Sequence, residues 1–247
     1  MHVEFLSHWS GHLGREMAVN RYGHAGIPIL VFPSSGGTHN EYADFGMIEA
    51  CTGSIEAGHI QFFTVSSVDS ESWLADWKSP HDRALAHQAY DRYIIDEAVP
   101  FIKHKTGWFD GMMVTGCSMG AYHAVNFFLQ HPDVFTKVIA LSGVYDARFF
   151  FGHDYGSDQA VYFNSPADYI WQQHDGWFID RYREAQVIIC TGLGAWEQDG
   201  LPSFYTLKDA FDSKELPAWF AEWGQDVSHD WIWWRKQMPY FLREMGL

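Results

Sequence analysis

The stretch of sequence that decides the fold is MMVTGCSMGAYHAVNFFLQHP, residues 112–132. It begins with a short apolar run, as a buried strand does, and continues with the apolar spacing of an amphipathic helix. Between these parts lies the turn GCSMG, residues 116–120. Such a sharp turn brings the strand and helix backbones close together, so side chains at Gly116 or Gly120 would collide with them. We therefore predict a strand, a tight turn and a helix, with Ser118 at the tip of the turn.

This order of elements is typical of the nucleophile elbow of an α/β-hydrolase, where a strained turn holds a serine hydroxyl at the carboxyl edge of the sheet. Ser118 is the predicted nucleophile. The helix after it places its positive N-terminal end where a developing anion would sit. Because short motifs of this kind also occur by chance, the prediction depends on finding an acid and then a histidine later in the chain.

Composition predicts a single folded domain spanning residues 1–247. The chain has 47% hydrophobic and 17% aromatic residues, which excludes disorder. Sixteen basic and 31 acidic residues give a net charge of −15, which disfavours nucleic acid and anionic membranes as partners.

No apolar run is long enough for a membrane span, and the first residues do not resemble a signal peptide. Together with three widely spaced cysteines, this predicts a cytoplasmic protein. Homo-oligomerisation is left open.

The remaining pattern predicts a doubly wound, mostly parallel sheet of about eight strands, which is the α/β-hydrolase fold. An opening hairpin is expected within residues 2–22, and the other strands and helices follow from apolar runs and helical spacing. One long helix is expected over residues 80–104, kinked or divided by Pro100. The other predicted strands are 27–32, 60–65, 137–141, 185–190 and 218–223, with helices over 202–214 and from about 231 to 244.

Two loops at the predicted carboxyl edge of the sheet are expected to serve the site. In this fold the oxyanion is bound by the N–H group of the residue after the serine, here Met119, and by one from the loop after the third strand. That loop is PSSGG, residues 33–37, and Ser35 is the expected second donor, with Gly36 as the alternative. Trp73 and Trp77, after the strand at 60–65, are expected either to line the substrate pocket or to anchor their loop on the core.

Residues 144–186 interrupt the alternation of strands and helices. The segment is rich in aromatic residues and has no clear strand pattern. It predicts a cap-like helical insertion over the sheet, in which at least half of the aromatic side chains serve packing. Insertions at this place shape the substrate pocket in such enzymes.

A serine nucleophile needs a base and a group that orients the base, and this fold places them in the order serine, acid, histidine. His229 lies after the last predicted strand and is the predicted base. Of the 14 histidines, His2, His8 and His12 come too early in the chain, and the four at 123, 131, 153 and 174 fall on the elbow helix or in the insertion. For the acid, Glu197 and Asp199 both lie after the strand at 185–190, and the pattern does not decide between them.

Other chemistries have weaker support. Cys117 precedes the tip of the turn, where the elbow turns a side chain away from the site, so it is expected to be a buried apolar residue. The sequence has no metal-binding spacing and no phosphate-binding glycine loop. We therefore expect no cofactor and no metal.

Four motifs resemble the esterase family of α/β-hydrolases that includes esterase D, an S-formylglutathione hydrolase, and the mycolyltransferases. They are GCSMG at 116–120, PSSGG at 33–37, the serine, aspartate and tryptophan pattern at 67–77, and SHDW at 228–231. The resemblance implies Glu197 as the acid, because the mycolyltransferases have a glutamate seven residues after a strand-ending cysteine, here Cys190. It also implies Ser35 and Met119 as oxyanion donors. At Pro33 and Ser34 the chain departs from the hydrolase branch, which has histidine or aspartate with glycine there.

The sequence thus predicts a serine hydrolase that cleaves carboxylic esters, with a triad of Ser118, His229 and Glu197 and a small-molecule ester as substrate. One alternative is an acyltransferase that uses the same triad with an alcohol in place of water. The other is a noncatalytic binding protein of the same fold. An intact set of triad residues disfavours the second alternative.

Overall fold

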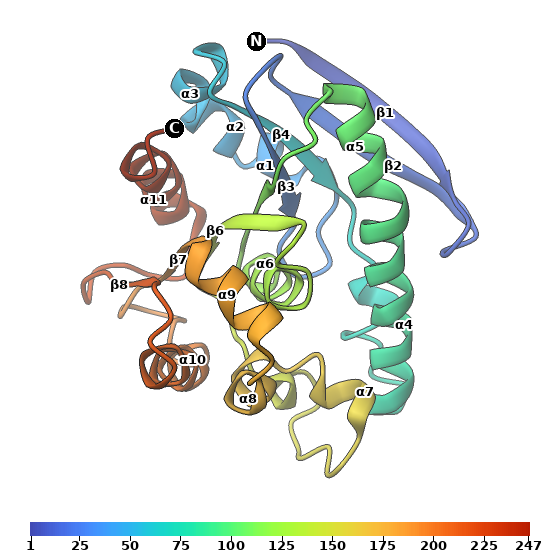
Figure 1. Ribbon diagram of the computed structural model, residues 1–247, viewed down its shortest axis with the longest axis vertical. Helices are drawn as coiled ribbons and strands as arrows, with labels where there is room; N and C mark the ends of the chain where they lie inside the picture. The colour runs from blue at the N-terminus through green and yellow to red at the C-terminus, as the bar shows by residue number, and fades with distance from the viewer.

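The computed structural model describes residues 1–247 and is built on one eight-stranded sheet (Figure 1). The strand order is β1-β2-β4-β3-β5-β6-β7-β8. β1 and β2 form an antiparallel hairpin, β2 pairs antiparallel with β4, and all other pairs are parallel. This confirms the predicted α/β-hydrolase fold. The strands are β1 (Val3–Ser10), β2 (Arg15–Tyr22), β3 (Ile27–Phe32), β4 (Ile60–Val65), β5 (Met112–Cys117), β6 (Phe135–Leu141), β7 (Gln186–Thr191) and β8 (Trp219–Glu222).

Helices cover both faces of the sheet and enclose two apolar cores (Figure 1). The smaller core lies under α1 (Glu41–Asp44), α2 (Met47–Ala50), α3 (Thr52–Glu56) and α11 (Trp231–Glu244). The larger core lies under α4 (Pro80–Tyr93), α5 (Val99–Thr106), α6 (Met119–Gln130), α8 (Pro166–Gln172), α9 (Gly176–Glu184) and α10 (Leu201–Ser213).

β3 shows why the central strands read as continuous apolar runs. Ile29 and Val31 enter the smaller core, whereas Leu30 and Phe32 enter the larger one. Because successive side chains point to opposite faces and both faces are covered, the positions on both faces of β3 are apolar.

The helix predicted over residues 80–104 is continuous but widens in the middle. α4 passes into a π-helical turn at Ile94–Ala98 and then into α5, which has Pro100 in its first turn. Proline has no N–H group, and its ring conflicts with the carbonyl group four residues earlier. A π-helical turn is a known way to accommodate such a local disruption within a helix. The proline therefore changes the helix locally and does not divide it.

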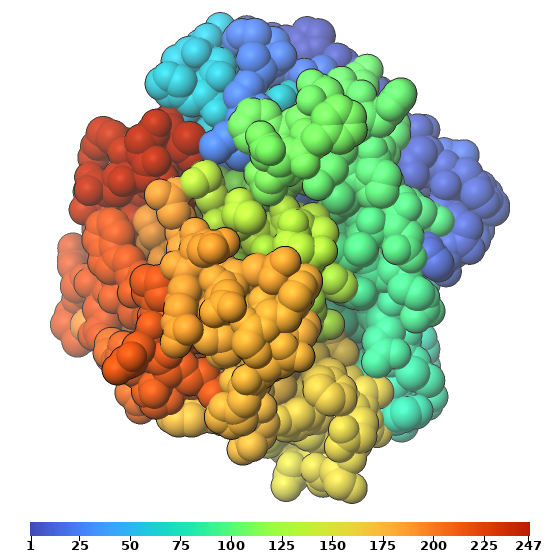
Figure 2. All heavy atoms as spheres, in the orientation of Figure 1, coloured from blue at the N-terminus to red at the C-terminus, as the bar shows by residue number.

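The segment between β6 and β7 is helical, with η3 (Ala147–Phe150) and α7 (Gln159–Tyr162) before α8 and α9. Figure 2 shows it, in yellow and orange, across the lower part of the visible face. Tyr169, Ile170 and Tyr182 enter the larger core, so part of its aromatic content serves packing. Near its start, Phe149 and Phe150 line a cavity beside Ser118.

No helix in the structure combines the length and apolar character required to cross a membrane.

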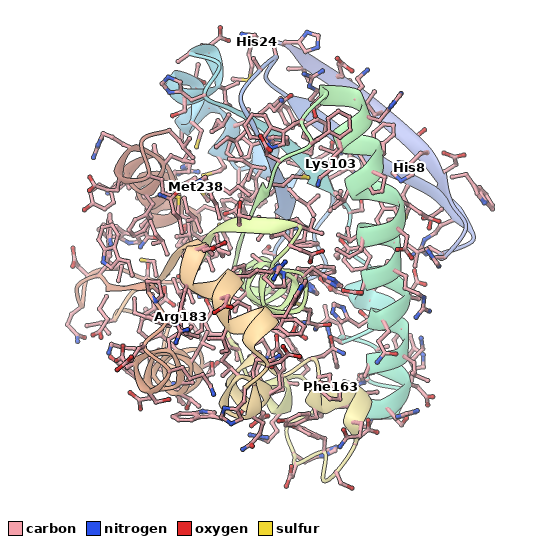
Figure 3. All side chains as sticks on the ribbon, viewed as in Figure 1. His8, His24, Lys103, Phe163, Arg183 and Met238 are labelled. Atoms are coloured by element: carbon pink, nitrogen blue, oxygen red, sulfur yellow. The ribbon has the colours of Figure 1, made fainter.

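The edge hairpin packs on the α4–α5 helix through its inner face. His8 of β1 lies on that side (Figure 3), and its ring stacks on Tyr93 and Phe101.

Candidate active site

The turn at residues 116–120 has the strained geometry predicted from the sequence. Ser118 lies between β5 and α6 with φ of 56° and ψ of −122°. A Cβ atom on Gly116 would lie 2.3 Å from the backbone of Gly120, and one on Gly120 would lie 2.4 Å from the carbonyl oxygen of Phe32. The N–H group of Ser118 donates to the carbonyl of Leu141 at 2.8 Å. Only glycine fits at these two positions, because a side chain on Gly116 would meet α6 and one on Gly120 would meet the end of β3.

His229 reaches Ser118 from the loop between β8 and α11. Its Nε2 atom lies 2.8 Å from Oγ of Ser118, and its backbone N–H donates to the carbonyl of Ala195 at 2.9 Å. The next residue, Asp230, accepts a hydrogen bond from the N–H of Ile232 at 3.0 Å and so caps α11. These two hydrogen bonds hold the loop in place at His229 and at the residue that follows it.

Glu197, and not Asp199, is the acid that contacts this histidine. Nδ1 of His229 lies 3.3 Å from Oε2 of Glu197, whose side chain is almost fully buried. Asp199 lines the cavity beside Ser118 and has no hydrogen bond to His229. Glu197, His229 and Ser118 therefore form one hydrogen-bonded chain that ends at the serine hydroxyl.

Sequence reasoning missed the groups that hold Glu197. Ser142, in the loop after β6, donates to Oε1 of Glu197 at 2.7 Å and accepts a hydrogen bond from Nε1 of Trp234 at 3.0 Å. The N–H of Gly192 donates to the same Oε1 at 3.3 Å, and Oγ1 of Thr191 lies 3.4 Å from Oε2. A buried carboxylate is stable only when such donors replace its water. The position of Ser142 at the end of a strand beside β5 was the only signal in the sequence.

The loop PSSGG, residues 33–37, lies across from the turn. Ser35 and Met119 line the same cavity as Ser118. The N–H of Ser34 donates to Oε2 of the buried Glu41 at 2.6 Å, and its hydroxyl donates to Oε1 at 2.5 Å. Burial raises the pKa of the Glu41 carboxyl. No local pattern in the sequence indicates that a carboxylate holds this loop.

Two cavities meet at Ser118 and His229. The first has a volume of about 150 Å³, and more than half of its lining residues are apolar: Leu74, Met119, Tyr122, Val144, Phe149, Phe150 and Trp196. The second, about 460 Å³, is more open and lies on the α11 side. Its lining includes charged and aromatic side chains, namely Asp230, Arg235, Phe45, Trp231 and Trp234.

Neither Trp73 nor Trp77 lines these cavities. Trp73 is fully buried, and its ring stacks on Phe150 with centroids 5.5 Å apart. Trp77 is 72% exposed and lies outside both cavities. Trp73 therefore anchors its loop on the core, which was the second of the two roles predicted for it. The side chain of this loop that lines the first cavity is Leu74.

Cys117 lies beside Ser118 in sequence but not in the cavity. Its side chain is fully buried, and its sulfur lies 3.6 Å from the hydroxyl of Tyr42. Burial raises the pKa of the Cys117 thiol far above its ordinary value. No group of three or more histidine, cysteine or acidic side chains is placed to hold a metal ion.

The fold and the serine at its strained turn define an α/β-hydrolase. Residues 10–245 match the family described as "Putative esterase". The chain therefore belongs to this esterase family, as its motifs predicted, and is a hydrolase of the esterase type.

Solved structures of esterases and related proteins share the fold at low sequence identity. An S-formylglutathione hydrolase from Agrobacterium tumefaciens is 15% identical, with a TM-score of 0.76 over 98% of this chain and 93% of that one. A ferulic acid esterase is 17% identical, with a TM-score of 0.74 over 98% and 95%. MPT51 (FbpC1) of Mycobacterium tuberculosis is 14% identical, with a TM-score of 0.74 over 97% and 96%. No curated protein matches the sequence.

Proposed function

We propose that this chain hydrolyses carboxylic esters through an acyl-Ser118 intermediate. The observation that carries the proposal is the hydrogen-bonded chain from Glu197 through His229 to Ser118. Nε2 of His229 would take the proton of the serine hydroxyl as Oγ attacks the ester carbonyl. Glu197 would keep the proton of the imidazole on Nδ1 and stabilise the imidazolium that forms.

The tetrahedral intermediate places a negative charge on the former carbonyl oxygen. Ser35 and Met119 are the proposed donors to this oxygen. The N–H of Ser35 donates to no protein acceptor, and Met119 begins α6, so its N–H is among those left without a partner within the helix. Collapse of the intermediate breaks the ester C–O bond, and the leaving oxygen takes the proton from Nε2. A water molecule, activated by the same histidine, then releases the acid.

The two cavities favour binding of the acyl part of the ester in one and of the alcohol part in the other. The acyl group must stay in place after the alcohol has left, so the more enclosed cavity suits it. A cavity of about 150 Å³ holds a group about the size of a benzene ring. The alcohol must leave before water attacks, and the open cavity on the α11 side gives it an exit. We therefore propose a small apolar acyl group and a larger alcohol.

An acyltransferase would use the same residues with a second alcohol in place of water. The open cavity favours this second candidate, because Phe45 and Trp231 stack there with centroids 4.9 Å apart and would offer an apolar face to an acceptor. Product analysis with and without added alcohols separates the two functions. Hydrolysis predominates if the free acid is the main product in both cases.

Labelling with a fluorophosphonate tests the proposal most directly. We expect one covalent adduct on the peptide that contains Ser118, and none in Ser118→Ala. A panel of esters, varied separately in acyl and alcohol parts, should show a sharp loss of rate once the acyl group exceeds one ring. Absence of both labelling and turnover would reject the proposal and favour a noncatalytic binding protein.

We also propose a reducing compartment such as the cytoplasm. All three cysteines are free thiols, and all are buried. Such cysteines behave as small apolar residues and need no oxidising environment.

A further inference from the structure

Two buried acidic residues, Glu41 and Asp69, hold the loop that carries Ser35, and Asp69 also binds a buried histidine. We infer that Asp69 and His123 are positioning residues for the oxyanion site. They tie the Ser35 loop to α6 and so fix the two N–H donors relative to each other. The inference rests on the proposed function, because an oxyanion forms only if the chain performs acyl transfer.

The backbone N–H groups of the loop show how it is held. The N–H of Ser34 donates to Glu41 at 2.6 Å, and that of Gly36 donates to Oδ2 of Asp69 at 3.3 Å. Between them, the N–H of Ser35 has no protein acceptor, and Ser35 lines the cavity beside Ser118. The loop is thus anchored on both sides of the one N–H group that is free for a substrate oxygen.

Asp69 also binds the helix that carries the other donor. Nε2 of His123 donates to Oδ1 of Asp69 at 2.9 Å, and the side chains are 0% and 1% exposed. His123 belongs to α6, which begins at Met119. One carboxylate therefore accepts hydrogen bonds from the Ser35 loop and from α6.

The surroundings of the pair argue against a role in packing alone. The ring of His123 lies against Phe32 and His87, at centroid distances of 5.5 and 5.3 Å. Apolar side chains could fill this space, and replacing both partners of a buried hydrogen bond by apolar groups of the same shape is often neutral or stabilising. Nδ1 of His123 is buried without a partner, which indicates that the proton lies on Nε2, toward Asp69.

The test compares two substitutions of Asp69 in the full chain. Asp69→Ala removes both hydrogen bonds, and we expect kcat to fall about 100-fold with little change in KM, since a shift of about 1 Å in a reacting geometry costs this much. Asp69→Asn can accept from Gly36 and donate to the other tautomer of His123. We expect kcat of Asp69→Asn to be about tenfold higher than that of Asp69→Ala. It should stay below that of the wild-type protein, because the other tautomer buries an unpaired Nδ1–H group.

Asp91→Ala is the matched control. Asp91 accepts a hydrogen bond from His131 at 2.8 Å, just beyond the C-terminal end of α6, and has no bond to the Ser35 loop. The substitution breaks a pair of the same chemistry at the same helix. We expect kcat for this variant to equal that of the wild-type protein.

Two further measurements separate positioning from loss of structure. The affinity for a trifluoromethyl ketone, which forms an oxyanion with the serine, should fall in Asp69→Ala by the same factor as kcat/KM. Without any substrate, the amide hydrogen of Gly36 should exchange faster in Asp69→Ala than in the wild-type protein. Thermal unfolding shows whether the variants are folded.

The outcomes distinguish this inference from the proposed function. A wild-type protein that is labelled at Ser118 and hydrolyses esters, beside an equally active Asp69→Ala, would overturn the inference alone. A wild-type protein that does neither would overturn the proposed function and this inference with it. If Asp69→Ala does not fold, Asp69→Asn combined with His123→Phe removes the tie to α6 without a buried charge. A kcat equal to that of Asp69→Asn would then overturn the inference.

Discussion

Ser142 donates a hydrogen bond to Oε1 of Glu197 at 2.7 Å, and this bond joins the loop after β6 to the acid that contacts His229. Ser142 itself has a φ of 57°. Its hydroxyl also accepts the hydrogen bond of Trp234. The orientation of the acid thus depends on a residue that follows a different strand.

We expect Ser142→Gly to lower kcat about tenfold, because a hydrogen bond to a charged group contributes about 1.5 kcal/mol or more. Glycine adopts the positive φ freely, so the substitution isolates the hydroxyl group. Steady-state kinetics measure the effect. Ser142→Ala serves as a comparison in which backbone strain is added, and it should be less stable than Ser142→Gly. An unchanged kcat in Ser142→Gly would show that Glu197 needs no such support.

Glu197 and Asp199 should differ sharply when each is made neutral. Glu197→Gln removes the charge that stabilises the imidazolium of His229, and we expect kcat to fall by as much as about ten-thousandfold. Asp199→Asn is the matched control, since Asp199 lines the cavity without touching His229. Its kcat should stay close to that of the wild-type protein. Equal losses in the two variants would contradict the assignment of Glu197.

Trp196 combines a strained backbone with an exposed ring at the first cavity. Its φ is 68°, and its side chain is 81% exposed. Trp196→Gly should raise the free energy of unfolding by about 1 kcal/mol, because glycine has no Cβ to strain. It should also raise KM, because the ring is lost. Trp196→Ala loses the ring and keeps the strain. Urea unfolding and kinetics of both variants separate the two effects, and equal stabilities would argue against backbone strain.

The cysteines should not react in the folded protein. Cys51, Cys117 and Cys190 are buried, and burial raises the pKa of the Cys51 thiol to about 12. A disulfide reagent should therefore find no thiol in the native state and three after denaturation. Treatment of the native protein should leave esterase activity unchanged. Rapid inactivation with one thiol modified would instead indicate that Cys117 is accessible beside Ser118.

Glu4 should make stability depend on pH in the acid range. Its carboxylate lies 2.6 Å from Nζ of Lys105 and 3.1 Å from Nη1 of Arg21. The hydrogen bond from Lys105, followed by that from His2, lowers the pKa of Glu4 from 4.5 to about 2. The folded state therefore binds its proton less tightly than the unfolded state. The stabilisation is present above pH 4.5 and is lost as the pH falls toward 2.

Thermal unfolding across this range, compared with Glu4→Gln, measures the effect. The wild-type protein should have the higher melting temperature at neutral pH, and the difference should shrink as the pH falls through the acid range. A constant difference would show that the charge of Glu4 does not contribute. Glu16→Gln on the neighbouring strand β2 is a suitable control, because no salt bridge involves Glu16.

The sequence was sufficient to predict those features of the fold and site that depend on local backbone geometry. The turn around Ser118 requires glycine on both sides, and the central strands require apolar residues on both faces, so the elbow and the eight strands could be predicted. His229 followed from chain order, because each loop after a parallel strand returns to the same edge of the sheet. These features depend on backbone geometry that short stretches of sequence encode.

Tertiary structure decided which side chains meet. The pattern could not choose between Glu197 and Asp199, since two residues in one loop differ only in the direction in which the folded loop points them. For the same reason it could not show that Trp73 is buried and Leu74 faces the cavity, or that Ser142 supports the acid. The anchoring of the Ser35 loop by Glu41 and Asp69 joins segments far apart in the chain. Such contacts arise only when separate elements pack, because no local pattern records which partner a polar side chain will find.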